Sequence, residues 1–204
     1  MIRKYYSGVR RYIDDMTTRA NDGIVSFGLG DWYDYGDFRA GFSRNTPVPL
    51  VATAHYYMVV RYLVEAARML DNRYDVAYYT HLGEEINKAF HREFYHKDTR
   101  QYGTGSQCSN ALPLFLGMVP AEDKQAVLDN LVADIKRHGN RLTNGDVGNR
   151  YLFQTLARNG LNELVYTMHN HEGAPGDGFH LIFGATTHTE QWVPRQCSSW
   201  HHFM

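Results

Sequence analysis

The chain has 204 residues, enough for one domain with a sizeable core, and we expect residues 1–204 to form a single domain. Its 21 basic and 22 acidic side chains leave a formal net charge of −1, which gives no electrostatic support to binding of nucleic acid or of an anionic membrane. No apolar run approaches the roughly 20 residues that cross a bilayer, and the N-terminal residues lack the apolar segment of a signal peptide.

The predicted elements are helices almost throughout, beginning with one over about Ile2–Arg19. The next helix is expected to open at Thr46, its N-cap, with Pro47 at the first helical position. It should continue to Leu70, because apolar residues recur along it at the spacing of one helix face. The same pattern returns between Tyr78 and Phe94.

Shorter helices follow in the second half of the chain. They are expected over Ser106–Leu116, from Pro120 to just before Gly139, over Val147–Arg158 and over Leu161–Met168. Short links between successive helices make them antiparallel neighbours. The fold class predicted from the residues is therefore all-α, built from stacked helical hairpins.

Two stretches interrupt the helical pattern, Gly23–Phe42 and Gly173–Gly184. The first is rich in glycine, aspartate and aromatic residues. The second contains a short apolar run, Phe179 to Phe183, which we expect to be a strand or an extended piece. Long connections between helices are common places for functional residues.

The first connection carries Asp31 and Trp32, with Asp34 and Asp37 close behind. Carboxylates beside an indole suit a sugar site, because they combine hydrogen bonds to hydroxyl groups with a flat apolar surface. The alternative is a loop in which aspartate only forms turns. The segment Asn144–Asn149 offers a further carboxylate, Asp146, that could take part in chemistry. The alternative is that Asp146 is only the N-cap of the following helix.

A second carboxylate–indole pair lies near the C-terminus, where Glu190 precedes Trp192 in Gly184-Ala-Thr-Thr-His-Thr-Glu-Gln-Trp192. A carboxylate there can accept a proton from water while the ring packs on a sugar. A plain alternative is an exposed glutamate before a core tryptophan. The composition fits a polar cleft lined with rings, since the chain has 15 Tyr, 10 Phe, 3 Trp and 11 His.

No cofactor or metal site is expected. The chain has no phosphate-binding glycine-rich loop and no zinc-binding helix. The group His169-Asn-His171-Glu172 lacks a third ligand at useful spacing. Cys108 and Cys197 fit neither a zinc site nor a disulfide framework, so we predict that both are buried free thiols.

The order of several motifs resembles a known family. They are Gly28-Leu-Gly-Asp-Trp-Tyr-Asp-Tyr-Gly36, Thr46-Pro-Val, Ala111-Leu-Pro-Leu with Gly117-Met-Val-Pro120, Leu142-Thr-Asn-Gly-Asp-Val-Gly148, Gly184 to Trp192, and the closing Ser198-Ser-Trp-His-His-Phe203. In this order and spacing they resemble the bacterial α-L-rhamnosidases, family 78 of the glycoside hydrolases. The match extends from near Tyr5 to the last residue.

The resemblance implies an (α/α)6 toroid and an inverting hydrolase that removes terminal α-L-rhamnose from a glycoside or polysaccharide. Such an enzyme uses a general acid and a general base roughly 6.5–9.5 Å apart. By resemblance, Glu190 is the general base, while Asp31, Trp32 and His202 contact the substrate. Trp192 is expected to add a stacking surface. The chain departs from the family at His201, where the family usually has Asn.

The family's general acid lies in an Arg-Asp-Glu-Arg-like stretch, and nothing before Gly28 matches it. The resemblance thus implies the C-terminal part of a catalytic domain, an incomplete toroid whose partner is the missing N-terminal part. Apolar helix faces left uncovered would favour self-association. Two alternatives remain, a non-catalytic helical protein that binds sugar or a partner, and another (α/α)6 carbohydrate-active enzyme.

Overall fold

The computed structural model describes residues 1–39, 41–182 and 184–186, and most of them are helical. The elements in chain order are α1 (Ile2–Arg19), α2 (Val48–Met69), α3 (Arg73–Phe94), β1 (Tyr95–His96), β2 (Gln101–Tyr102), α4 (Gln107–Leu116), α5 (Lys124–Arg137), α6 (Asp146–Arg158), α7 (Asn162–His169) and α8 (Asp177–Ile182). Within these ranges no helix has the length and apolar character needed to span a bilayer. The predicted all-α class is confirmed.

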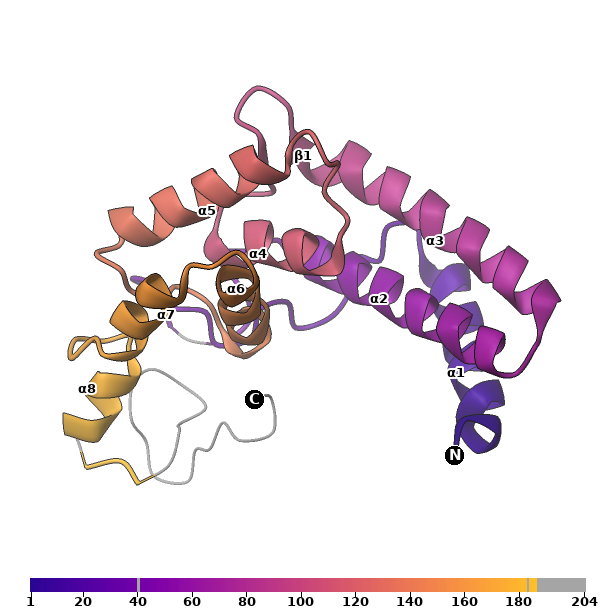
Figure 1. Ribbon diagram of the computed structural model, residues 1–204, viewed down its shortest axis with the longest axis horizontal. Helices are drawn as coiled ribbons and strands as arrows, with labels where there is room; N and C mark the ends of the chain where they lie inside the picture. Colours follow the sequence, from indigo (N-terminus) through magenta and orange to yellow (C-terminus); the bar gives the residue numbers. More distant parts are fainter. Residues whose placement is uncertain (40, 183, 187–204) are drawn as a thin grey trace.

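The helices form two layers that curve into an open arch (Figure 1). Helices α2, α4 and α6 pack in series along its inner side. Helix α3 packs on α2, α5 packs on α4, and α7 packs on α6, while α1 packs on α2 near one end of the arch. This alternation of inner and outer helices is the arrangement that stacked helical hairpins produce.

The inner helices begin at the same edge of the arch. The Thr46 and Ser106 hydroxyls, just before α2 and α4, are 2.7 Å apart. The Thr143 backbone N–H, just before α6, donates to Oε1 of Gln107 in α4 at 3.0 Å. The connections that precede α2, α4 and α6 therefore gather at one edge.

Apolar side chains fill the space between the layers in successive clusters. Leu50, Phe90 and Leu112 are fully buried where α2, α3 and α4 meet. A second cluster, with Leu131 and Leu152, joins α5 to α6 and α4. A third lies between α1, α2 and α3 and contains Ile13, Leu63 and Ile86.

Local signals explain several helix ends. The Ser106 side chain accepts from Ser109 N–H and caps the start of α4. Gly117 ends α4 with φ 69°, the left-handed conformation that glycine adopts without strain. The Asn72 side chain accepts from Asp75 N–H and caps α3 in the same way.

Three boundary predictions were wrong. Thr46 does not cap α2, because Pro47 occupies the N-cap position and the Thr46 hydroxyl contacts Ser106. Asp146 is the first residue of α6 and Gly145 is its N-cap. The segment from Pro120 forms a turn, and α5 begins only at Lys124.

The strand or extended piece expected between Phe179 and Phe183 was also wrong, because residues 177–182 form the short helix α8. Asp177 in its first turn favours a helix start, and Ala185 N–H closes its end on the His180 carbonyl. A short apolar run does not distinguish strand from helix by periodicity. The described strands lie instead in the hairpin of β1 and β2, which the sequence pattern did not indicate.

Candidate sugar site at the loop edge

Asp31 links the α1–α2 connection to the start of α6. Its Oδ2 accepts from Gly145 N–H at 3.0 Å and its Oδ1 from Gly148 N–H at 2.6 Å. The carboxylate is buried, with 1% of the residue exposed. An anion at this position also meets the positive end of the α6 dipole.

Glycine is required at both donor positions because the loop lies very close to α6. A Cβ atom on Gly145 would lie 1.9 Å from the Trp32 carbonyl oxygen. One on Gly148 would lie 2.7 Å from Asp31 Oδ2 and 2.8 Å from Cys108 Cβ. The two glycines thus allow the direct contact between backbone and carboxylate.

Burial shapes the ionisation of this group. It raises the pKa of Asp31 to about 6, although the N–H bonds from Gly145 and Gly148 act in the opposite direction. Burial, together with the charge of Asp31, raises the pKa of the Cys108 thiol well above its usual value. Cys108 is a buried free thiol, as predicted; Cys197 lies outside the described residues.

Trp32 is held by its own backbone. Its carbonyl oxygen accepts from Asp146 N–H at 2.8 Å, so the first turn of α6 fixes the chain at this residue. The half-buried indole meets the rings of Tyr33 and Phe42 edge-on, with centroids 5.1 and 5.3 Å away. The result is a small aromatic group beside the start of α6.

Asp34 organises the rest of the connection. Its Oδ2 accepts from the Arg44 and Asn45 N–H groups at 2.7 and 2.5 Å. Burial raises its pKa, and these bonds partly oppose that rise. The Asn45 side chain in turn donates to the carbonyl oxygens of Tyr35 and Thr143, each at 2.9 Å. Asp34 therefore stabilises the conformation of the α1–α2 connection, whereas Asp37 is exposed.

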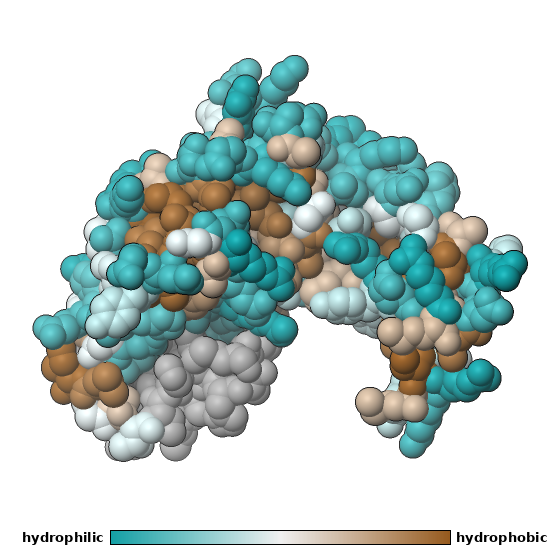
Figure 2. Space-filling view, in the orientation of Figure 1, coloured by the Kyte–Doolittle hydropathy of each residue, from teal (hydrophilic) through white to brown (hydrophobic). Residues whose placement is uncertain are grey.

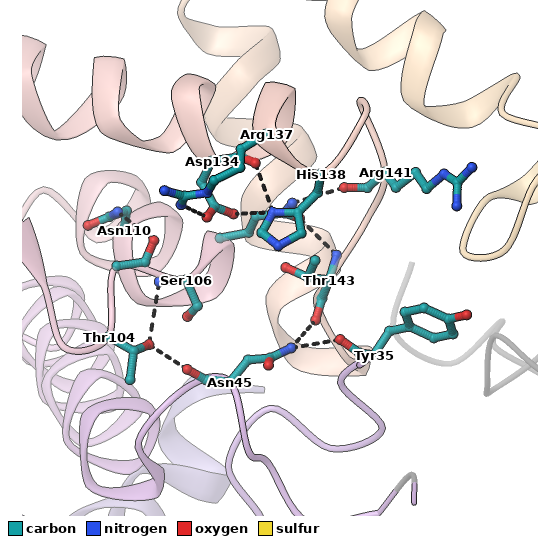
Figure 3. A network of polar contacts seen from close by, with 12 residues as sticks. Tyr35, Asn45, Thr104, Ser106, Asn110, Asp134, Arg137, His138, Arg141 and Thr143 are labelled. Atoms are coloured by element: carbon teal, nitrogen blue, oxygen red, sulfur yellow. Dashed lines mark hydrogen bonds and ion pairs between the residues drawn. The ribbon is translucent and has the colours of Figure 1, made fainter. Parts of the chain in front are cut away.

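A cleft of about 630 Å³ opens beside this loop, and we call it the rim cleft. Its lining comes from the connections before α2, α4, α6 and α8 and from the end of α5: Tyr35, Gly36, Asp37, Phe38, Asn45, Thr104, Ser106, Asp134, His138, Arg141, Leu142, Thr143, Ala174 and Pro175. Figure 3 shows the polar side of this region, with Asp134 between Arg137 and His138.

The structure brings together some of the predicted residues and leaves others undescribed. Asp31 and Trp32 meet the segment 142–148, which the sequence indicated as a family motif and, through Asp146, as a further candidate position. The buried position of Asp31 shows a structural task, and its predicted contact with sugar stays a prediction. Glu190, Trp192 and His202 lie outside the described residues.

Other residues of this edge were missed by sequence reasoning. Gln107 bonds the backbone before α6 through both ends of its amide, to Thr143 N–H at 3.0 Å and the Arg141 carbonyl at 2.9 Å. Its position as first residue of α4, directly after the Ser106 N-cap, was the available signal. In the described ranges no three metal-ligating side chains come together. His169 contacts Asp177 and stacks on Phe153, with ring centroids 4.1 Å apart.

Comparison with known proteins gives a consistent assignment. Residues 1–204 match the family model of the bacterial alpha-L-rhamnosidase 6 hairpin glycosidase domain. The structure of an alpha-L-rhamnosidase from Dictyoglumus thermophilum is similar with a TM-score of 0.88 at 33% identity, over 97% of this chain and 22% of that chain.

The chain is also similar to a protein and to a solved structure from Streptomyces avermitilis. An alpha-L-rhamnosidase from this organism is 28% identical over 184 residues, which are 89% of this chain and 16% of that protein. A crystal structure of an S. avermitilis alpha-L-rhamnosidase complexed with L-rhamnose gives a TM-score of 0.85 at 25% identity, over 96% of this chain and 18% of that chain. The chain thus spans about a fifth of the length of these relatives. On the match over its whole length, the chain belongs to the bacterial alpha-L-rhamnosidase six-hairpin glycosidase family.

Proposed function

We propose that this chain supplies the general-base part of the active site of an α-L-rhamnosidase, a glycoside hydrolase that releases terminal α-L-rhamnose with inversion. The observation that carries the proposal is the family match over residues 1–204. The 33% identity to the Dictyoglumus thermophilum alpha-L-rhamnosidase supports the same activity class.

The edge of the arch at which α2, α4 and α6 begin suits binding of the sugar. Asp31 and the α6 backbone hold Trp32 at a fixed place beside the inner helices. A rigid indole there gives the apolar face of a deoxy sugar a surface to pack on. We propose that Trp192 and His202 complete this sugar site.

In the proposed reaction, Glu190 removes a proton from water as the water attacks the anomeric carbon. The bond to the departing oxygen breaks, and a carboxylic acid on the opposite side of the sugar donates a proton to that oxygen. We propose that this acid lies on the family's Arg-Asp-Glu-Arg-like segment, which has no match before Gly28 in this chain. The chain by itself should then show little turnover.

The test is Glu190→Gln in the parent protein that contains the acid-bearing segment, assayed with an aryl α-L-rhamnoside. The amide keeps the shape of the side chain but takes no proton, so kcat should fall about 10²–10⁴-fold with little change in sugar affinity. Trp192→Ala is the matched comparison and should mainly weaken binding. Near wild-type turnover of Glu190→Gln, or ordinary turnover by the 204-residue chain alone, would contradict the proposal.

A further inference from the structure

A groove lies between α1 and the first turns of α3, and we call it the α1–α3 groove. The start of α3 is at the right-hand end of the arch, where α1 also lies (Figure 1). Arg10 and Asp14 line one side of the groove, and Tyr74, Tyr78 and Tyr79 line the other. Its volume of about 430 Å³ falls within the range of about 300–1,000 Å³ that small-molecule sites occupy.

The tyrosines of this groove are far from Asp31 and Trp32. Those two residues precede α2, whereas Tyr74 and Tyr78 lie in the first turns of α3, just after α2 has ended. The 22 residues of α2 extend over about 33 Å. The groove therefore offers a surface on a different part of the arch from the loop edge.

Two exposed aromatic rings form one wall of the groove. Tyr74 and Tyr78 are 73% and 48% exposed, and as residues i and i+4 they lie on the same side of α3. Their ring centroids are 6.4 Å apart and their planes differ by only 8°. The buried Tyr79 meets Tyr78 edge-on, with centroids 4.9 Å apart, and so supports its orientation. Two parallel rings can take two consecutive flat units of one ligand.

Two exposed polar side chains face these rings and are held in place by a buried hydroxyl. Tyr79, which is 1% exposed, donates from its hydroxyl to Asp14 Oδ1 at 2.8 Å and accepts from Arg10 Nε at 3.3 Å. Burial, and then the bond to Asp14, raises the pKa of Tyr79 to about 12, so this hydroxyl keeps its proton at neutral pH.

Hydrogen-bonding capacity remains on both side chains. Among the described residues no hydrogen bond engages the second carboxylate oxygen of Asp14. Arg10 has donors beyond the Nε–H that Tyr79 uses. An acceptor and a donor at fixed positions suit the adjacent hydroxyl groups of a sugar.

The separation of α1 and α3 is set by a second buried group. Asp75 is 1% exposed, and its Oδ2 accepts from the Tyr6 hydroxyl at 2.7 Å and from the Asn72 side chain at 2.8 Å. Tyr6 belongs to α1, whereas Asp75 lies in the first turn of α3. The groove is thus preformed, which lowers the cost of ordering a ligand in it.

The charges of the groove favour a neutral ligand. Its lining has one cation, Arg10, and one anion, Asp14. A phosphate site would need an excess of cationic donors, and a carboxylated sugar would meet the Asp14 carboxylate. A neutral pyranose has hydroxyl groups at its edge and C–H groups on its faces, which matches polar side chains opposite exposed rings.

We propose that the α1–α3 groove binds a neutral, extended sugar chain of β-1,4-linked pyranose units, with two consecutive units on Tyr74 and Tyr78 and hydroxyl groups on Arg10 and Asp14. Such a chain is a flat ribbon whose faces carry C–H groups, so it can follow two parallel rings. This site performs no chemistry. It holds a polysaccharide on the protein, and it requires neither rhamnose nor Glu190.

The test is an NMR titration of the 204-residue chain with ring-labelled tyrosines. The two probes are cellotetraose, which is neutral and contains no rhamnose, and tetragalacturonate, which has the same number of sugar units but carries carboxylates. Cellotetraose should shift the ring signals of Tyr74 and Tyr78, and tetragalacturonate should bind more weakly.

Variants at Tyr74 separate ring stacking from other effects. Tyr74→Ala should weaken cellotetraose binding about threefold to tenfold, the effect of losing one aromatic contact. At 73% exposure the change should leave the fold intact. Tyr74→Phe keeps the ring and should bind like the wild type. Asp14→Asn should also weaken binding, because the amide replaces one acceptor with a donor.

Tyr166→Ala is the matched control. Tyr166 is 67% exposed and lies on α7, outside the groove, so its loss should not change the affinity for cellotetraose. Absence of shifts at Tyr74 and Tyr78, or equal losses in Tyr74→Ala and Tyr166→Ala, would overturn the proposal.

The remaining outcomes also decide the question. Tetragalacturonate that binds as tightly as cellotetraose would overturn the assignment to a neutral chain. A Tyr74→Ala variant that self-associates less but keeps its affinity for cellotetraose would make the groove an interface between copies. Because neither probe contains rhamnose, these results leave the rhamnosidase proposal to be decided by the kinetics of Glu190→Gln.

Discussion

At the scale of single residues, Asp31 shows how one side chain serves the site without facing solvent. Both of its oxygens bind backbone N–H groups of residues more than a hundred positions away, Gly145 and Gly148. These bonds hold the adjacent Trp32 against the start of α6. The cost is a buried carboxyl group whose pKa is raised to about 6 by desolvation.

Stability should therefore depend on pH through Asp31. The folded-state pKa of about 6 lies above the ordinary value of 3.8, so folding favours the protonated form. That contribution is fully present below about pH 4 and is lost as the pH rises through about 6, a change on the order of 3 kcal/mol. Urea unfolding of wild type and Asp31→Asn at both ends of this window measures it.

The free-energy difference between wild type and Asp31→Asn should shrink, or turn against the wild type, as the pH rises. Asp37→Asn, which changes an exposed carboxylate on the same connection, should follow the wild-type profile. Parallel profiles for wild type and Asp31→Asn would show that Asp31 does not titrate in this window.

At the scale of elements, the start of α6 lies very close to the α1–α2 connection. Gly148 lies within this helix, where glycine ordinarily costs stability relative to alanine. The surroundings explain why this position is glycine, because the Asp31 carboxylate and Cys108 occupy the space that a side chain would need.

Gly148→Ala should lower the unfolding free energy by about 1–3 kcal/mol, since overpacking outweighs the gain in helix propensity. Gly8→Ala is the matched control, because Gly8 is also helical but nothing lies within 4 Å of its Cβ position. It should raise stability by about 0.5–1 kcal/mol. Thermal unfolding of the two variants distinguishes the cases, and stabilisation by both would contradict the close approach of Asp31 to α6.

Sequence patterns predicted the elements better than their junctions. Helices α2 and α3 each present a long apolar face, and the helical spacing of its residues can be recognised in the sequence alone. The start of α2 was misplaced because the Thr46 hydroxyl bonds Ser106, 60 residues away, instead of its own helix. Contacts of this kind depend on the assembled arch and leave no local signal.

The same reason limits what the sequence says about the site. The pairing of Asp31 with Gly145 and Gly148 crosses more than a hundred residues. The carboxylate and the glycines were both visible as motifs, but their contact was not. The rim cleft is harder still to anticipate, since its walls come from several connections that meet only after the helices pack.

At the scale of the whole molecule, the arch leaves an apolar helix face uncovered at one end. Ile2, Tyr5, Val9 and Tyr12 of α1 are 41%, 56%, 37% and 54% exposed. Their spacing places them on one side of the helix, where they continue the face that Ile13 and Met16 bury farther along. Figure 2 shows apolar surface at this end of the arch. Continuous apolar surface of this kind is typical of an interaction site.

We expect the chain to self-associate through this face of α1, or to dock there on the acid-bearing segment that we propose for the parent protein. Each apolar side chain fully buried in such an interface contributes about 1.5–3 kcal/mol. Tyr5→Glu combined with Val9→Glu should thus raise the dissociation constant at least about tenfold, measured by sedimentation velocity over a concentration series. Tyr166→Glu, at a 67% exposed tyrosine on α7, is the control and should sediment like the wild type.

A wild-type chain that stays monomeric throughout the series would show that the α1 face is not an interface between copies. Equal dissociation in the α1 and Tyr166 variants would place the interface elsewhere.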